Sequence, residues 1–169
     1  MGLFGKEKDN AYIIIVGCGR LGSSLANAMS DGGESVLIID SDRAAFDKLS
    51  PTFGGIIMTG DATEIFVLNE AQMGAATAVI SVTNNDNTNI LVAQMAREMF
   101  HIERVIARLY DPDRECVYRE FGIDTICPAV LSANEIGRLL RAAKPERSDE
   151  PGRTDAPKTA VVQNGGGAA

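Results

Sequence analysis

Apolar and polar residues alternate along the chain in blocks that predict strands and helices in turn. Short apolar runs, rich in β-branched residues, are typical of strands that are buried on both faces. These runs lie at residues 11–16, 35–40, 54–61, 76–83, 104–110 and 123–127. Strands that alternate with helices and short connections indicate a parallel sheet covered by helices on both faces.

Segments with apolar residues at helical spacing follow the apolar runs. These predicted helices lie at residues 20–33, 41–50, 62–73, 86–100, 111–122 and 128–143. Asp111 and Pro112 are a favourable start for the fifth helix, because aspartate caps free N–H groups and proline tolerates the first helical position. The last helix begins at Pro128 or, if Ser132 and Glu135 form a capping box, about one turn later.

This alternation predicts one Rossmann-like domain of the α/β class. Right-handed crossovers favour a doubly wound parallel sheet of six strands in the order 3-2-1-4-5-6. We expect residues 1–10 to be an N-terminal leader and residues 11–143 to form the domain. Residues 144–169 are rich in proline, glycine and charge and have no apolar period, so we expect a disordered tail.

Three glycines between the first strand and the first helix give the motif G-x-G-x-x-G. Gly17 permits a tight turn, Gly19 lets backbone approach a pyrophosphate, and Gly22 lets the helix pack closely on the strand. Asp40 ends the second strand about 20 residues on, where its carboxylate can accept hydrogen bonds from both hydroxyls of a ribose. NAD or an ATP-type ligand is therefore favoured over NADP, although the nearby Arg43 leaves NADP open.

Two further polar turns end the third and fourth strands, "TGDAT" at 59–63 and "TNNDN" at 83–87. Ligands of such sheets gather at this carboxyl edge, but the same residues also suit helix capping by Thr63 and by Asn85 or Asp86. The predicted site residues, from the loops at the ends of the first four strands, are Gly17, Cys18, Gly19, Leu21, Gly22, Asp40, Ser41, Arg43, Asp61, Ala62, Thr83 and Asn84.

Composition excludes several classes of function. The formal net charge of −7 and the pI of about 4.7 argue against non-specific nucleic acid binding. No apolar run approaches the roughly 18 residues that span a bilayer. Cys18, Cys116 and Cys127 lack metal-ligand spacing, so we expect reduced thiols in a cytoplasmic protein and no metal site. Cys18 is either a small filler residue or, alternatively, a redox-sensing thiol.

An enzyme of this fold needs more than a cofactor-binding site. It needs a substrate pocket, usually on a second domain, and an acid or base. The single histidine, His101, lies at a helix–strand junction where we expect it to be exposed. We therefore predict a non-enzymatic nucleotide-binding module, with an NAD(H)-dependent oxidoreductase or a redox-sensing nucleotide-binding protein as the alternative.

Several motifs in order resemble the RCK (TrkA-N) domain. They are G-x-G-R-x-G, the terminal Asp40, G-D-A-T at 60–63, the asparagine-rich turn, and "ARLYDP" at 107–112, and the resemblance covers about residues 11–142. It implies a cytosolic domain that binds ATP, ADP or NAD(H), pairs as a homodimer and often assembles into an octameric ring. It also implies a membrane partner, a potassium channel or transporter subunit that responds to the bound state.

The resemblance also assigns roles to single residues. Arg20 would approach the phosphates of the ligand, including one held by a neighbouring subunit, and Arg108 would face the nucleotide or the dimer seam. The last helix would cross to the partner, although packing on its own sheet is equally compatible with its broad apolar side. That side consists of Val130, Leu131, Ile136, Leu139, Leu140 and Ala143.

Overall fold

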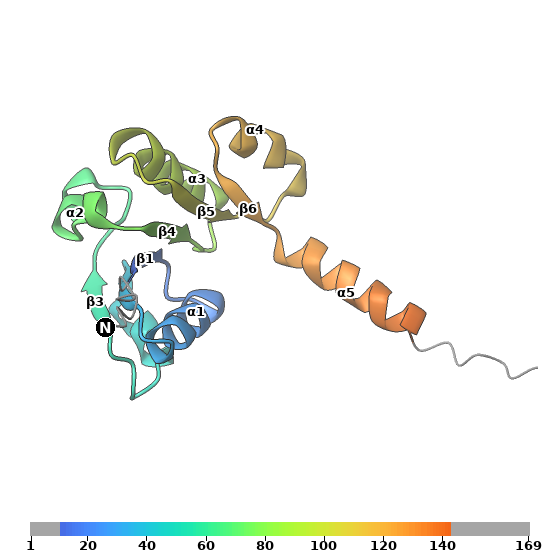
Figure 1. Cartoon of the computed structure of the whole chain (residues 1–169), viewed down its shortest axis with the longest axis horizontal. Helices are drawn as coiled ribbons and strands as arrows, with labels where there is room; N and C mark the ends of the chain where they lie inside the picture. Colours follow the sequence, from blue (N-terminus) through green and yellow to red (C-terminus); the bar gives the residue numbers. More distant parts are fainter. Residues whose placement is uncertain (1–10, 143–169) are drawn as a thin grey trace, which may run out of the picture.

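Six strands form one parallel sheet, and its order confirms the prediction (Figure 1). The computed structural model describes residues 11–142, in which the strands lie in the order β3-β2-β1-β4-β5-β6. The strands are β1 (Tyr12–Val16), β2 (Ser35–Asp40), β3 (Ile56–Thr59), β4 (Ala78–Ser81), β5 (Arg104–Arg108) and β6 (Asp124–Ile126). The strand order reverses between β1 and β4, so the loops at their carboxyl ends diverge and leave a crevice.

Helical segments connect these strands and also follow the last one. The α-helices of the described residues are α1 (Arg20–Asp31), α2 (Ile65–Glu70), α3 (Asp86–Gln94), α4 (Glu115–Glu120) and α5 (Pro128–Ala142). Shorter helical turns complete the connections. Three are 3₁₀-helical, namely η1 (Arg43–Lys48), η2 (Met73–Ala75) and η4 (Pro112–Arg114), and η3 (Met95–Met99) is π-helical.

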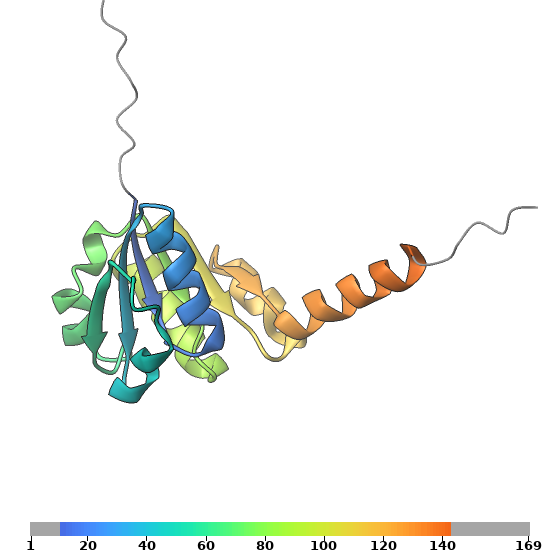
Figure 2. The ribbon, with the colours of Figure 1, turned by 90° about the horizontal axis from the view of Figure 1, so that it is seen from below.

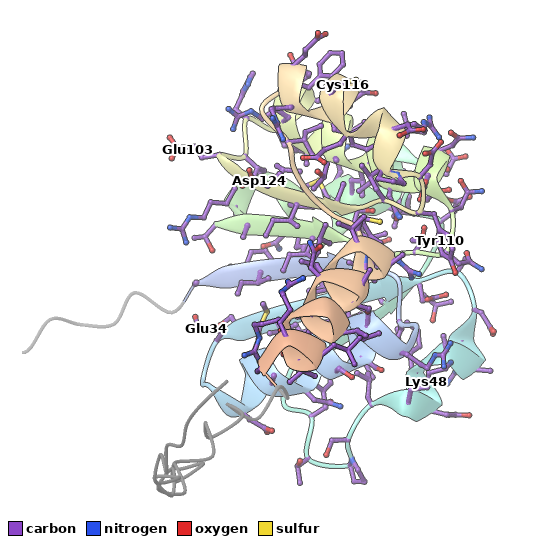
Figure 3. All side chains as sticks on the ribbon, turned by 90° about the vertical axis from the view of Figure 1, so that its right-hand side faces the viewer. Glu34, Lys48, Glu103, Tyr110, Cys116 and Asp124 are labelled. Carbon is purple, nitrogen blue, oxygen red and sulfur yellow. The ribbon has the colours of Figure 1, made fainter. Side chains whose placement is uncertain are left out.

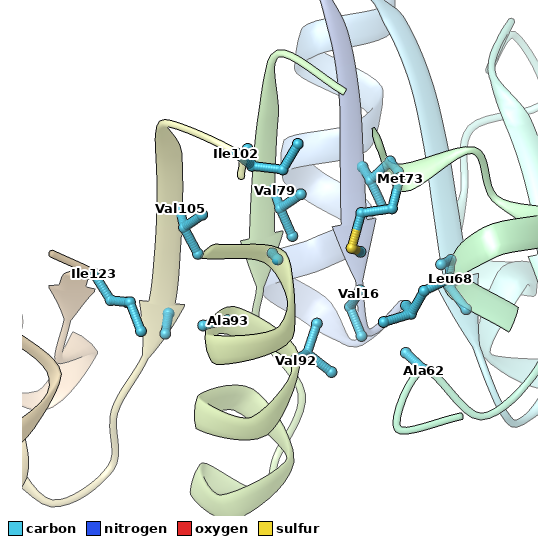
Figure 4. Close-up of a cluster of buried hydrophobic side chains, with 14 of the residues drawn as sticks. Val16, Ala62, Leu68, Met73, Val79, Val92, Ala93, Ile102, Val105 and Ile123 are labelled. Carbon is cyan, nitrogen blue, oxygen red and sulfur yellow. The ribbon is translucent and has the colours of Figure 1, made fainter. Parts of the chain in front are cut away.

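Alternate residues of β1 face two different apolar clusters. Ile14 and Val16 belong to the cluster that joins the sheet to α2, α3 and α4 through Leu68, Val92 and Tyr118, part of which is drawn in Figure 4. Because successive strand residues point to opposite faces, the whole strand is buried only if both faces are covered. This cluster therefore fixes α3 beneath the crevice.

The opposite face of the sheet carries the second apolar cluster. Ile13 and Ile15 of β1 pack there with Ala26 of α1 and Phe46 of η1. Figure 2 shows α1 on the near side of the strands, as expected for a doubly wound sheet. The two clusters together hold the glycine-containing β1–α1 connection between rigid elements.

The third predicted helix, at 62–73, is the least accurate prediction. Asp61 accepts hydrogen bonds from the backbone N–H and the hydroxyl of Thr63, at 2.9 and 2.7 Å, and this turn delays the helix. Helix α2 begins at Ile65 with Glu64 at its N-cap, so the prediction that Thr63 caps the helix is wrong. The left-handed conformation of Gln72, with a φ of 52°, separates α2 from the η2 turn.

Three other predicted helices differ in type rather than position. The segment predicted at 41–50 forms the 3₁₀ turn η1, which begins where Asp42 accepts from the N–H of Ala44 at 2.9 Å. The helix predicted at 86–100 ends in the π turn η3. The fifth helix begins with the 3₁₀ turn η4, and Asp111 caps it as predicted by accepting from the N–H of Asp113 at 3.1 Å.

Helix α5 extends away from the sheet (Figures 1 and 2). It begins at Pro128, so the later start at Ser132 is not adopted, and Glu135 instead pairs with Arg138 at 2.6 Å. No residue of α5 is buried within the described chain, and its large apolar residues are exposed. Packing of α5 on its own sheet is therefore not observed, and crossing to a partner remains a prediction.

The predicted domain limits fall largely outside the structure. The expected leader at 1–10, the expected domain end at 143 and the expected tail at 144–169 all lie outside the described residues. Within residues 11–142, no helix combines the length and apolar character that a bilayer crossing requires.

Candidate functional site

The first glycine of the motif lies where a side chain would not fit. Gly17 has a φ of 100°, in the left-handed region that side chains disfavour. A Cβ at this position would lie 2.9 Å from the backbone nitrogen of Thr83, just after β4. The N–H of Gly17 donates to the carbonyl of Ile39 at 2.8 Å. Gly17 thus allows the loop after β1 to contact both neighbouring strand ends.

The other two glycines have different surroundings. A Cβ on Gly22 would lie 1.8 Å from the carbonyl oxygen of Gly17, so glycine is required for α1 to pack against the loop. A Cβ on Gly19 would meet no atom within 4 Å. The packing of the protein itself therefore does not require glycine at position 19. The open space above Gly19 fits a ligand whose phosphates approach the backbone.

A cleft of about 1090 Å³ opens above this loop at the carboxyl edge of the sheet. It brings together residues from the ends of β1, β2, β3, β4 and β5. Of the predicted site residues, those lining the cleft are Gly17, Cys18, Gly19, Arg20, Leu21, Asp40, Ser41, Asp61, Ala62, Thr83, Asn84 and Arg108. Gly22 and Arg43 do not line it, because Gly22 packs α1 on the loop and Arg43 is an exposed residue at the start of η1.

Asp40 is fixed against the glycine loop. Its Oδ2 accepts a hydrogen bond from the backbone N–H of Cys18 at 2.6 Å, and its Oδ1 accepts from the N–H of Asp42 at 2.9 Å. An ionised carboxylate has about four lone-pair sites, so these bonds leave capacity for hydroxyl donors. Asp40 can therefore hold the loop and a ribose at once.

Cys18 is buried although it lies in the glycine loop. Burial raises the pKa of the Cys18 thiol, and the nearby charge of Asp40 raises it further, while Lys48 acts weakly in the opposite sense. Since the thiolate is the reactive form, a raised pKa makes Cys18 a poor nucleophile. These surroundings favour the filler role over the redox-sensing alternative.

The turn after β3 presents an ionised carboxylate at the rim of the cleft. The two hydrogen bonds from Thr63, first that of its backbone N–H and then that of its hydroxyl, lower the pKa of the Asp61 carboxyl below its ordinary value. Asp61 lines the cleft together with Gly60 and Ala62. This turn can offer both a carboxylate and backbone groups to the edge of a base.

Arg108 carries an unpaired donor at the far side of the cleft. Its Nε is buried and has no hydrogen-bond partner among the described residues. Its guanidinium carbon lies 5.0 Å from the centre of the Tyr110 ring, within the range of a cation–π contact. A buried donor without a partner is costly. Because this Nε is closed to solvent, an anionic or carbonyl group in the cleft would meet Arg108 through the part of the residue that lines the cleft.

Arg20 is exposed at the first position of α1 and lines the cleft. Its side chain makes no hydrogen bond or ion pair with any residue of the described chain. The N-terminus of a helix disfavours a cation, because the free N–H groups carry partial positive charge. A phosphate between Arg20 and those N–H groups would relieve this repulsion.

The asparagine-rich turn after β4 is held on two sides. The Asn85 side chain caps α3 by accepting from the N–H groups of Asn87 and Thr88 at 2.9 and 3.1 Å, which confirms one predicted cap. The alternative, Asp86, does not cap but accepts from the backbone N–H of Tyr110 at 2.9 Å. This contact joins the start of α3 to the end of β5, so the turn and Arg108 belong to one rigid rim.

Beneath this rim lies Asn89, a fully buried residue that the sequence analysis missed. Its Oδ1 accepts from the hydroxyl of Ser81, and from the N–H and hydroxyl of Thr83 at 2.9 and 2.7 Å. Its Nδ2 donates to the carbonyls of Thr83 and Arg108, both at 3.1 Å. The polarity of "TNNDNTN" marked a turn, but no local pattern identified which asparagine points inward.

Other residues of the cleft also escaped prediction. Lys48, Thr88, Tyr110, Leu131 and Ser132 line it. Figure 3 shows Lys48 and Tyr110 at the carboxyl edge of the sheet, away from Glu34 and Glu103 at the amino edge. Leu131 and Ser132 were missed because α5 was assigned only to a dimer contact, whereas its first turn follows β6 directly at this edge.

His101 and the acidic residues offer no second site. His101 is exposed after η3, as predicted, with a φ of 58°, and it does not line the cleft. Within residues 11–142, no three His, Cys, Asp or Glu side chains are grouped so that they could hold a metal ion. The cleft is therefore the candidate site.

The family comparison matches this geometry. The model of the TrkA-N domain matches residues 13–128, which include every strand except the start of β1. The Trk system potassium uptake protein TrkA of Streptomyces coelicolor is 43% identical over 129 residues, or 76% of this chain. A Trk system potassium uptake protein TrkA homolog of Methanothermobacter thermautotrophicus is 31% identical over 134 residues, or 79% of this chain. The chain spans only 58% and 62% of the length of these two relatives.

Solved structures with the same fold include two of GsuK in complex with nucleotides. The GsuK channel bound to NAD is 27% identical with a TM-score of 0.68, over 81% of this chain and 24% of that one. GsuK bound to ADP is 26% identical with a TM-score of 0.68, over 82% of this chain and 36% of that one.

Proposed function

The chain belongs to the TrkA-N domain family, and from this premise we propose that it is a non-enzymatic, nucleotide-binding regulatory module of a potassium uptake or channel system. The observation that carries the proposal is the open space above Gly19 in a loop whose neighbouring N–H is fixed by Asp40. This arrangement suits a diphosphate on the loop and a ribose on the carboxylate.

The ligand is an adenine nucleotide of the ATP, ADP or NAD(H) class. Asp40 would repel a 2′-phosphate, and Arg43, which could have neutralised that charge, does not line the cleft. The loop N–H groups at the start of α1 would hold the phosphates, and Asp61 and Ala62 would face the base. The NAD and ADP complexes of GsuK support this ligand class.

Two arginines would distinguish nucleotides by the charge of their distal groups. Arg20, which has no partner in the described chain, would contact phosphates of its own ligand or of one bound by a neighbouring subunit. A guanidinium forms bidentate, charge-assisted bonds to phosphate. Arg108, which lines the cleft, would face the part of the ligand that extends beyond the glycine loop.

The module would act as a homodimer, with a ring of dimers as a further state. Support comes from α5, whose apolar residues Leu131, Ile136, Leu139 and Leu140 are exposed along a helix that buries none of its residues in the described chain. Leu131 also lines the cleft, so the ligand and the partner would share one helix. Nucleotides that favour different dimer geometries would then shift the conformation that a membrane potassium channel or transporter subunit senses in the cytoplasm.

The rival functions have less support. For the oxidoreductase alternative, the single histidine, His101, lies away from the cleft, so the acid or base would have to come from another residue that lines it, such as Lys48, Asp61 or Tyr110. The redox-sensing alternative needs a reactive thiolate, and Cys18 is buried with a raised pKa. The relatives reported above are named as potassium uptake proteins and a channel, and these names favour transport over redox chemistry.

Mass spectrometry of the nucleotides that co-purify with the full chain tests this function directly. Calorimetric titration with ATP, ADP, AMP, NAD and NADH should then give dissociation constants at or below the micromolar range for at least one of them. An NADPH titration serves as the ligand control, since Asp40 should reject it. A chain that carries none of these compounds and ignores all of them at millimolar concentration contradicts the proposal.

A further inference from the structure

One buried side chain joins the ends of β4 and β5 at the edge of the cleft. Asn89 does not line the cleft, yet it binds the end of β4 through Thr83 and the end of β5 through Arg108. The backbone of Thr83 in turn lies close to Gly17, since a Cβ added at Gly17 would lie 2.9 Å from the Thr83 nitrogen. Contacts therefore run without interruption from the glycine loop through Thr83 and Asn89 to Arg108.

The chemistry of these contacts allows only one orientation of the Asn89 amide. Its oxygen faces donors, the hydroxyl of Ser81 and the N–H and hydroxyl of Thr83, while its NH₂ faces the carbonyls of Thr83 and Arg108. Turning the amide over would place oxygen against both carbonyls and NH₂ against the Thr83 N–H. A carboxylate or a shorter side chain could not make both sets of bonds.

We propose that Asn89 is a positioning residue, which sets the separation between Thr83 and Arg108 so that a nucleotide on the glycine loop also reaches Arg108, which lines the cleft. This inference rests on the function proposed above. According to this inference Asn89, which lies outside the cleft, controls the affinity for the distal part of the ligand. The pairing of β4 with β5 ends at Ser81 and Ala107, and beyond it the Asn89 side chain joins the two segments.

Ser81 provides a matched control within the same network. It is fully buried, it donates to the same Asn89 oxygen at 3.1 Å, and it does not line the cleft. Removing its hydroxyl takes one bond from Asn89 but leaves every bond from Asn89 to Thr83 and Arg108. A purely structural network would respond to both changes in the same way, through stability alone.

The experiment compares the full-length wild type, Asn89→Ala and Ser81→Ala by calorimetric titration with ADP and ATP, at a temperature where circular dichroism shows each variant to be folded. We expect at least a tenfold loss of affinity for Asn89→Ala and a change of less than twofold for Ser81→Ala. A folded Asn89→Ala that binds within twofold of the wild type overturns the inference while the proposed function stands. Equal losses for the two variants also overturn it.

A measurement on the wild type covers the case in which Asn89→Ala does not fold. The side-chain NH₂ resonances of Asn89 in an ¹⁵N-labelled chain should shift as ADP is added, with the midpoint of the calorimetric titration. Resonances that stay unchanged at saturating ADP overturn the inference. A wild type that binds neither ADP nor ATP overturns the proposed function itself, which calorimetry reveals before any variant is compared.

Discussion

Oδ2 of Asp40 accepts a hydrogen bond of 2.6 Å from the backbone N–H of Cys18, which ties the end of β2 to the middle of the glycine loop. One carboxylate thus organises the loop that would hold phosphates and stands where a ribose would bind. A substitution of Asp40 should therefore change both the stability of the fold and the affinity for a nucleotide.

Replacing Asp40 by alanine should lower stability and nucleotide affinity together. The N–H groups of Cys18 and Asp42 lose their acceptor, which costs about 1–3 kcal/mol in the free energy of unfolding. Affinity for ADP should fall more than tenfold. Urea unfolding and calorimetry measure the two effects, with Asp47→Ala, an exposed carboxylate outside the cleft, as the control. Unchanged ADP affinity would exclude Asp40 from the site.

Alanine at two glycines should separate folding from binding. Gly17→Ala combines a φ of 100° with a contact of 2.9 Å to Thr83, so we expect a loss of about 1–3 kcal/mol in the free energy of unfolding. Gly19→Ala meets no atom within 4 Å and should leave stability unchanged while weakening nucleotide binding. Thermal unfolding with and without ADP measures both. A Gly19→Ala chain with normal affinity would argue against phosphates above that residue.

Arg20→Ala should reduce the preference for ATP over ADP. Charge-assisted bonds to a terminal phosphate contribute about 1.5–3 kcal/mol each, so the ATP affinity should fall about tenfold or more. Arg43→Ala is the control, since Arg43 is also an exposed arginine near the site but does not line the cleft. If the ratio of the two dissociation constants is the same in wild type and Arg20→Ala, Arg20 does not sense the distal phosphate.

Leu140→Asp should abolish the dimer without unfolding the domain. Leu140 is 70% exposed on α5, so a charge there costs the isolated domain little but is unfavourable inside an apolar interface. Phe66→Asp is a matched control, because Phe66 is also 70% exposed but lies on α2. Sedimentation velocity should give a monomer for Leu140→Asp and the wild-type state for Phe66→Asp. Dimers in both variants would place the interface elsewhere.

The free energy of unfolding should depend on pH through ionisation of the Cys18 thiol. Because burial and Asp40 raise the folded-state pKa of this thiol above its ordinary value, its contribution to stability is complete below the ordinary value and is lost as pH rises through the raised one. Urea unfolding of wild type and Cys18→Ala across the alkaline range separates this group from Tyr12 and Tyr118, whose pKa values burial also raises. If the free energies of unfolding of the two chains change with pH in the same way, the predicted contribution of Cys18 is wrong.

The sheet was predictable because its signals are local. Runs such as "YIIIV" and the strand–glycine–helix order define both the strands and the edge that carries the loop. The helices at 62–73 and 41–50 were predicted less well. There the Asp61 and Asp42 side chains compete with helical hydrogen bonds by capturing backbone N–H groups two residues on.

The site was predictable as a set of strand ends but not as a set of contacts. Parallel strands bring Gly19, Asp40, Asp61 and Thr83 to one edge whatever the details of their packing. The inward orientation of Asn89 depends on carbonyls and donors that lie 6 to 19 residues away in sequence. No periodicity carries that information, which only the folded arrangement of β4, β5 and α3 provides.

Helix α5 has 15 residues and buries none of them within the described chain. Isolated helices of about 12–15 residues are only marginally formed in water, and here a single exposed Glu135–Arg138 pair adds little. Folding of this helix and its association with a second molecule should then be coupled. The concentration of the protein in the cell would therefore set the fraction of chains in which α5 is folded. Under the proposed dimer, dilution would therefore unwind α5 as it separates the two subunits.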